Sequence, residues 1–284
     1  MRLGIRAHDL KKDSIENMVK KMSEDGFRCT QLALRKAISE FNNTPEAMTP
    51  GMAMYLKEIF QKNNVDISVL GCYLNLGTPD QGQLEDILKT YKAHIRFASI
   101  LGCGVVGTET GAVNTEYKFE PENHSEKALD YFIENLKIVI DYAEKMGVIF
   151  AIEPVYKHIV CNNERTRKVL DAINSPNLQV ILDPVNLLSV DNYTEQDSIV
   201  KQAFELYGDE IAVIHCKDFK IENDDIISIP SGTGEFHYDV LLPLIEKKKP
   251  HIHVLLENTK PENAVKTKEF MQGLYEDIRK NAAK

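Results

Sequence analysis

Short apolar runs alternate with longer stretches of helical period along the whole of this 284-residue chain. Several of the runs are apolar nearly throughout, which is typical of parallel strands covered on both faces. Eight strands that alternate with eight helices favour an α/β fold, a (β/α)₈ (TIM) barrel, as a single domain over residues 1–284. An open doubly wound sheet is the alternative. The predicted strands are Leu3–Ala7, Cys29–Leu34, Ile67–Leu74, Val105–Thr108, Val148–Glu153, Leu178–Leu182, Ile211–His215 and Ile252–Glu257.

Helix signals fill the stretches between these runs. Ser14 and the pair Thr49-Pro50 predict helix starts, because Ser and Thr cap helices and Pro suits the first turn. Gly102 and Gly147 end two long amphipathic stretches. The segment GCGVVG at 102–107 has the letters of a dinucleotide-binding fingerprint, but it ends a helix and begins a strand, which is the wrong context. The other predicted helices are Gln83–Leu101, Ser125–Met146, Glu164–Ile173, Thr194–Tyr207, Tyr238–Lys247 and Asn263–Arg279.

Composition narrows the classes of partner. The chain has 34 Lys+Arg against 43 Asp+Glu, a formal net charge of −9, which argues against phosphate-driven binding to nucleic acid or anionic lipid. It lacks the run of about 18 apolar residues that a membrane span needs and the apolar core of a signal peptide. Its five cysteines form no C-x-x-C pair and are expected to be reduced thiols. We therefore expect a cytoplasmic protein with no nucleic-acid or membrane partner.

Hard polar residues end four successive apolar runs in the second half of the chain. They are Glu153, Asp183, His215 and Glu257, and each follows the previous one by about one strand–helix unit. In a barrel of this type the carboxyl ends of the strands meet at one mouth, where the chemistry of such folds lies. Three acids crowded together would repel one another, and a divalent cation relieves that conflict. Each could instead be a strand-end residue facing solvent, but four in succession favour a metal site for Mn²⁺, with Mg²⁺, Co²⁺ or Zn²⁺ as alternatives.

The same residues carry a resemblance to a known family. The strings AIEPV, ILDPVN, VIHCKDF and VLLEN, in that order, resemble the xylose isomerase-like barrel superfamily. This superfamily includes sugar phosphate isomerases and epimerases, ketose 3-epimerases and the apurinic endonucleases of AP endonuclease family 2. The resemblance implies that Glu153, Asp183, His215 and Glu257 hold one divalent metal. It further implies that Glu153 and Glu257 move protons as catalytic acids and bases, and that the protein forms a homodimer or homotetramer.

A coherent reaction follows from these residues. We expect a metal-dependent isomerase or epimerase of a sugar or sugar phosphate, which removes a proton next to a metal-bound carbonyl and passes through an enediolate. A metal-dependent lyase or dehydratase would begin with the same proton abstraction, so the sequence does not separate the two. A phosphodiesterase of the apurinic endonuclease type is disfavoured by the net charge of −9 and by Asn186, where that family has a further His ligand. A non-catalytic sugar-binding barrel would not require both Glu153 and Glu257.

Further side chains near the strand ends are candidates for substrate contacts. His8, Glu109 and His158 follow or end strands, although each could equally be a surface or capping residue. The segment after His215 departs from the epimerases, which have an Arg nearby, and offers three polar side chains instead. Arg6 either fills the barrel interior or reaches a substrate anion, and the loop 231–234 is expected to be a simple tight loop. The predicted substrate-binding residues are therefore His8, Glu109, His158, Asn186, Lys217, Asp218 and Lys220.

Overall fold

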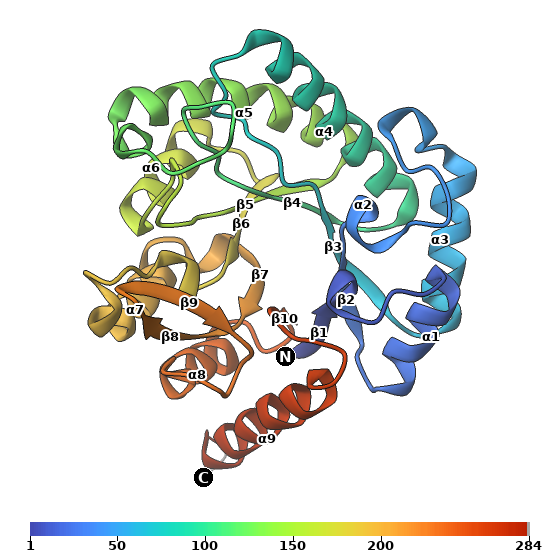
Figure 1. Ribbon diagram of the computed structural model, residues 1–284, viewed down its shortest axis with the longest axis vertical. Coiled ribbons are helices and arrows are strands. Elements are labelled where there is room, and N and C mark those ends of the chain that lie inside the picture. Colours follow the sequence, from blue (N-terminus) through green and yellow to red (C-terminus); the bar gives the residue numbers. More distant parts are fainter. Residues whose placement is uncertain (283–284) are drawn as a thin grey trace.

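The eight apolar runs form a closed barrel of parallel strands in the computed structural model, which describes residues 1–282 (Figure 1). Around the barrel the strands follow the order β1-β10-β7-β6-β5-β4-β3-β2, so the open doubly wound sheet is excluded. The barrel confirms the expected fold, and positions 283–284 of the expected domain lie outside the described residues. The barrel strands are β1 Arg2–Arg6, β2 Cys29–Leu32, β3 Asp66–Gly71, β4 Val105–Glu109, β5 Ile149–Glu153, β6 Leu178–Leu182, β7 Ile211–Cys216 and β10 His253–Leu256.

Helices surround the barrel and begin and end at the residues that the sequence marks. The Ser14 side chain accepts a hydrogen bond from Asn17 N at the start of α1, and Gly102 ends α4 at a φ of +82°. A left-handed φ of this kind suits a residue without Cβ. The helices are α1 Ile15–Glu24, α2 Leu34–Ala37, α3 Pro50–Lys62, α4 Gln81–Leu101, α5 Glu126–Met146, α6 Asn163–Ile173, α7 Gln196–Tyr207, α8 Tyr238–Lys248 and α9 Ala264–Ala282. Short 3₁₀ turns span Ala7–Asp9, Pro45–Ala47, Pro121–His124, Val185–Leu187, Tyr193–Glu195 and Gly208–Glu210.

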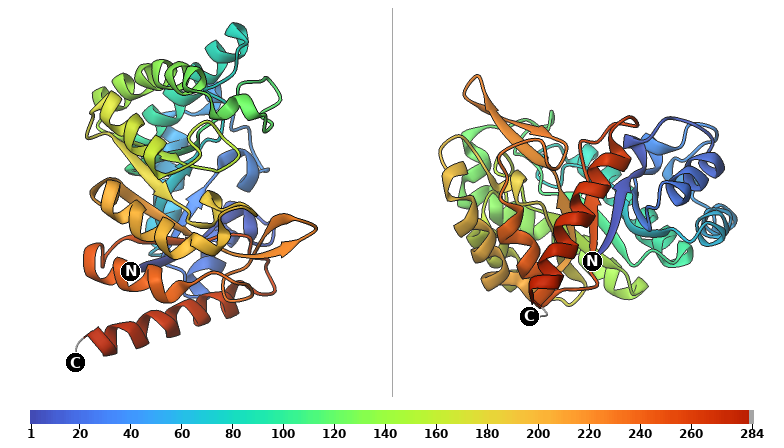
Figure 2. Two further views of the ribbon diagram at one scale, coloured as in Figure 1. Left: turned by 90° about the vertical axis from the view of Figure 1, so that its left-hand side faces the viewer. Right: turned by 90° about the horizontal axis from the view of Figure 1, so that it is seen from below.

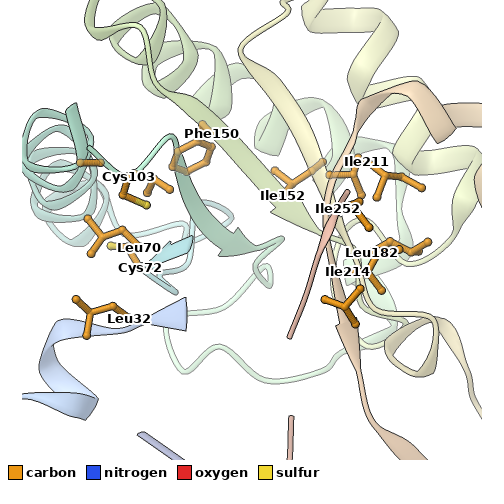
Figure 3. Packing of buried hydrophobic residues seen from close by; sticks show 14 of the residues in the cluster. Leu32, Leu70, Cys72, Cys103, Phe150, Ile152, Leu182, Ile211, Ile214 and Ile252 are labelled. Atoms are coloured by element: carbon orange, nitrogen blue, oxygen red, sulfur yellow. The ribbon is translucent and has the colours of Figure 1, made fainter. Parts of the chain in front are cut away.

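Two apolar cores hold the barrel together. Because side chains alternate along a strand, one set points into the barrel and the other toward the helices. The inner set is small and consists of Cys29, Val69, Ala151, Ile181, Val213 and Leu255. The outer set packs under the helices and includes Leu70, Phe150 and Ile214, as Figure 3 shows. The filled interior leaves the carboxyl-end mouth as the place for polar side chains.

A two-stranded hairpin that the sequence analysis did not predict follows β7. It consists of β8 (Asp218–Glu222) and β9 (Asp225–Ile229), paired antiparallel, and it projects from the body of the molecule in both views of Figure 2. The turn residues Asn223 and Asp224 have φ values of +51° and +59°, as a tight two-residue hairpin turn requires. The hairpin therefore adds two strands outside the barrel, in a region where the sequence analysis predicted no element.

The buried His94 on α4 predicts a pH-dependent stability. Its Nδ1 donates to Thr90 O over 2.9 Å, and burial is the main cause that lowers its pKa from 6.5 to about 4. The neutral ring therefore stabilises the fold above pH 6.5, and this stability is lost as the pH falls toward 4. Between pH 7 and pH 5 the loss attributable to His94 is about 2 kcal/mol.

Denaturant unfolding at these two pH values measures this effect. We expect His94→Gln to reduce the difference in unfolding free energy between pH 7 and pH 5 by about 2 kcal/mol, because glutamine does not titrate. The matched control His251→Gln, at an exposed position, should unfold with the same pH dependence as the unaltered protein. An unchanged pH dependence in His94→Gln would contradict the assignment.

No helix within residues 1–282 is both long enough and apolar enough to cross a membrane. The five cysteines are free and buried, in agreement with the expectation of reduced thiols.

Candidate metal centre

The four polar residues expected to form a metal site converge at the carboxyl end of the barrel. Glu153 ends β5, Asp183 follows β6, His215 lies near the end of β7, and Glu257 follows β10. All four are buried, and one possible ligand atom from each lies within 4.8 Å of the others. The parallel arrangement of the strands causes this convergence, because it brings every strand end to the same mouth.

His215 lies between the two glutamates. Its Nδ1 is 3.2 Å from Glu153 Oε1 and 3.1 Å from Glu257 Oε1. Burial alone would lower its pKa, but the two carboxylates outweigh burial and raise the pKa to about 10. The ring is therefore protonated in the metal-free chain at neutral pH. A divalent ion would replace that proton as the positive charge between the carboxylates.

Lys217 supplies a fixed positive charge beside the cluster. Its Nζ donates to Glu257 Oε2 over 3.1 Å and lies 2.8 Å from Asp183 Oδ2 at an angle outside hydrogen-bond geometry. Burial would raise the pKa of Glu257, but Lys217 and His215 outweigh it and hold that pKa well below its usual range. Arg6 Nη1 adds a further contact of 3.3 Å to Glu257 Oε1. Glu257 is therefore ionised and has both carboxylate oxygens engaged.

The residues present fit a divalent ion. Asp183 Oδ2 is buried and accepts no hydrogen bond from residues 1–282, which is uncommon for a buried polar atom, and the Lys217 ammonium lies 2.8 Å from it. Burial is the main cause that raises the pKa of Asp183, to about 6. Burying three carboxylates close together is costly, and a divalent ion bound to them lowers that cost. Three carboxylates and one imidazole form a donor set that Mn²⁺, Zn²⁺ and related ions accept.

Asn186 and Asp218 have structural contacts that their sequence positions did not reveal. Asn186 Nδ2 donates to Glu153 Oε1 over 2.7 Å and so orients that carboxylate. The Asp218 carboxylate accepts backbone N–H groups of Phe219, Gly232 and Phe236 over 2.9, 3.0 and 2.9 Å. Asp218 therefore organises the loop 231–234, in keeping with the expectation of a simple tight loop there.

Two other candidates lie away from the cluster. Lys220 is half exposed on β8 and forms an ion pair with Glu222, so the structure does not bring it to the cluster. His8 lies in the 3₁₀ turn after β1, where burial is the main cause that lowers its pKa to about 4. Lys217, in contrast, is part of the cluster itself. A role for these residues in substrate binding stays a prediction.

Glu109 and His158 form a second polar group next to the metal cluster. Glu109 is paired in register with Glu153, and burial, followed by the charge of Glu153, raises its pKa to about 7. His158 Nδ1 lies 3.9 Å from Glu109 Oε2. The sequence analysis missed Tyr117, whose hydroxyl donates to the same oxygen over 3.3 Å and whose ring lies 5.0 Å from that of His158. Tyr117 comes from a loop at a φ of +59°, and its sequence context carries no signal for this position.

Comparison with known proteins places the chain in a family. The family described as "Xylose isomerase-like TIM barrel" matches residues 7–274. The chain belongs to this family. This confirms the resemblance seen in the strand-end motifs. No curated protein matches the chain at a significant level.

Solved structures share the fold of this xylose isomerase-like chain at low sequence identity. A D-tagatose 3-epimerase-like protein has a TM-score of 0.79 and 18% identity, with 99% of this chain and 100% of that one covered. The IOLI protein, solved with a zinc atom, has a TM-score of 0.75 and 19% identity over 98% and 99% of the two chains. Mannonate dehydratase from Streptococcus suis serotype 2 has a TM-score of 0.75 and 13% identity over 100% and 95%. At these identities the likeness shows a common fold.

Proposed function

We propose that this protein is a divalent-metal-dependent isomerase or epimerase of a sugar or sugar phosphate. The observation that supports it most is the buried cluster in which Glu153 and Glu257 flank His215, with Asp183 completing the donor set. A site that only bound sugar would have no need of two buried carboxylates on either side of a ligand group. We propose Mn²⁺ as the ion, held by Glu153, Asp183, His215 and Glu257.

A bound divalent ion would act as a Lewis acid that makes the proton beside a substrate carbonyl more acidic. The residues of the chain do the remaining work. Glu153 Oε1 is held by Asn186 and His215, whereas Oε2 meets no hydrogen-bond donor of residues 1–282. Glu153 can therefore accept the substrate proton at Oε2. Glu257 is held by Lys217 as an ionised carboxylate, so it takes up a proton from solvent before it passes one to the opposite face of the substrate carbon. A proton returned to the same carbon gives an epimer, and one returned to the neighbouring carbon gives an isomer.

Proton exchange with solvent tests this proposal. The Mn²⁺-loaded protein is incubated in D₂O with a panel of sugars and sugar phosphates, and mass spectrometry measures deuterium in the recovered compounds. We expect at least one compound to gain one deuterium on carbon and to yield a product of otherwise unchanged mass. A product lighter by one water would identify the lyase or dehydratase reaction instead. Absence of exchange with every compound would contradict the proposed function.

A further inference from the structure

Unpaired buried polar atoms are concentrated at the barrel mouth. Eight buried side-chain nitrogen or oxygen atoms lack a hydrogen-bond partner among residues 1–282. Six of the eight belong to side chains near the carboxyl ends of six different strands. Buried polar atoms are normally paired, so a group of orphans at one end of the barrel indicates a polar ligand. The six atoms are His8 Nδ1, Gln31 Oε1, Tyr73 Oη, His158 Nδ1, Asp183 Oδ2 and His215 Nε2.

Two of the six come from the β2–β3 side of the barrel and were assigned no role from the sequence. Gln31 is 2% exposed and is paired in register with Arg6, whose side chain reaches the metal cluster. Residues paired in parallel register point to the same face of the sheet, so Gln31 also points into the barrel. Its amide oxygen is therefore an unpaired acceptor that faces the interior of the mouth.

Tyr73 lies next to Gln31 over Gly71, the last residue of β3. A Cβ at position 71 would lie 2.9 Å from Tyr73 Cε2 and 3.4 Å from Gln31 Nε2, so glycine makes room for this pair. A Cβ on Gly107 of the neighbouring strand β4 would lie 3.9 Å from the Tyr73 hydroxyl, which shows that the hydroxyl reaches across toward β4. Burial, followed by the charges of Glu153 and Glu257, raises the pKa of Tyr73, as expected for a buried hydroxyl near these carboxylates.

We infer that Tyr73 and Gln31 form a subsite for uncharged hydroxyl groups of the substrate, opposite the metal cluster. This inference rests on the proposed function, because it places the reactive carbonyl at the cluster and the rest of the sugar along β2 and β3. The phenol donates and the amide accepts, a pair suited to neighbouring hydroxyls of a polyhydroxy aldehyde or ketone. A ligand of this kind pairs both orphaned atoms without bringing in a charge.

The charges around the mouth favour a sugar without phosphate. Arg6 is occupied by Asp9, with two hydrogen bonds of 3.0 Å, and by Glu257. Lys217 is occupied by Asp183 and Glu257. A phosphate dianion buried at the subsite would meet no free buried cation among these groups, and burying an unpaired charge is costly. The substrate class assigned here is therefore a neutral, unphosphorylated sugar.

Lys36 is the cation near this subsite that would favour a phosphate ester over a free sugar. It is exposed, and its Nζ lies 5.8 Å from the centroid of the Tyr73 ring. At this position it contacts the ring face rather than the buried hydroxyl. It also serves as a control, because Lys36→Gln should leave the binding of a neutral sugar unchanged.

Binding of matched sugars by the Mn²⁺-loaded protein tests the subsite. The probes are D-fructose, D-xylulose and D-ribulose, each compared with its terminal phosphate ester by titration calorimetry. We expect at least one free sugar to bind at least about tenfold more tightly than its ester. Tyr73→Phe and Gln31→Met should each lower the affinity for that sugar by about tenfold, which is the usual effect of losing one hydrogen bond to a neutral group. Both variants should keep the metal content and melting temperature of the unaltered protein.

Three results would overturn the inference. They are tighter binding of an ester, absence of binding by every free sugar, and unchanged sugar affinity in both variants. Solvent exchange separates this failure from that of the proposed function. A free sugar that binds through Tyr73 and Gln31, with no proton exchange in any compound of the panel, would refute the function and retain the subsite. If a phosphate ester exchanges a proton while no free sugar binds, the subsite is overturned and the proposed function is retained.

Discussion

Glu153→Gln is expected to lower proton exchange between substrate carbon and solvent by about 10³-fold, within the range that a positioned general base contributes. The amide cannot accept the proton, yet it can still meet Asn186, which donates to Glu153 Oε1 over 2.7 Å. Glu257→Gln is expected to show a loss of similar size while it retains some metal, because Asp183, His215 and Glu153 remain. Deuterium incorporation at saturating Mn²⁺ measures both variants.

Glu222→Gln is the matched control, since Glu222 is exposed on the hairpin and pairs only with Lys220 among its described neighbours. It should exchange protons at the rate of the unaltered protein. Exchange that continues unchanged in Glu153→Gln would remove this residue from the role of base. Unchanged exchange in Glu257→Gln would leave Glu153 as the single acid/base residue.

Asp183→Asn is expected to weaken Mn²⁺ binding by at least about 100-fold, because it removes a charged metal ligand. Substituting even a residue that only hydrogen-bonds to a metal ligand lowers metal affinity by up to about 100-fold. The substitution preserves shape and also removes one of three crowded carboxylates. We therefore expect the metal-free variant to be at least as stable as the metal-free unaltered protein. The variant should lose the thermal stabilisation that Mn²⁺ confers, which for a saturated site is about 2.7 kcal/mol at an ion concentration 100 times Kd.

Asp86→Asn, at an exposed position on α4, is the control and should bind Mn²⁺ normally. Thermal unfolding with and without Mn²⁺ separates the two effects. If the metal-free Asp183→Asn protein fails to fold, His215→Ala replaces it in the experiment. This variant should also lose Mn²⁺ binding. Retention of full Mn²⁺ affinity by both variants would contradict the assigned ligands.

The strand pattern was sufficient to predict the fold and to bring the four polar residues together. Glu153, Asp183, His215 and Glu257 each end or follow a buried parallel strand, and in a closed barrel that rule alone gives one meeting point. Boundaries were less accurate. The run Cys29–Leu34 contains a strand only to Leu32, because Leu34 already begins the short helix α2. Apolar residues occur in both elements, so hydrophobicity did not separate them.

Other parts of the site depend on contacts between residues far apart in the sequence. The turn pair Asn223-Asp224, flanked by Ile221 and Ile226, is a hairpin signal after β7, but two further strands do not fit the pattern of one strand per helix that predicts the barrel. The inward direction of Gln31 depends on its register with Arg6, which no single segment reveals. The contact of Tyr117 with Glu109 depends on a loop whose path is set by tertiary packing. The burial of Asp218 depends on the distant backbone N–H groups of Gly232 and Phe236, which donate to its carboxylate.

Metal content of the purified protein tests the central claim most directly. Protein prepared without chelator and without a His tag would be analysed by elemental mass spectrometry and then titrated with Mn²⁺ after metal removal. Our account predicts one divalent ion per chain, held by the cluster around His215 and lost in His215→Ala. The account would be contradicted by a chain that binds no ion and gains no thermal stability from Mn²⁺, Co²⁺ or Zn²⁺. Two or three zinc ions per chain would contradict it equally, because they would indicate a multinuclear site.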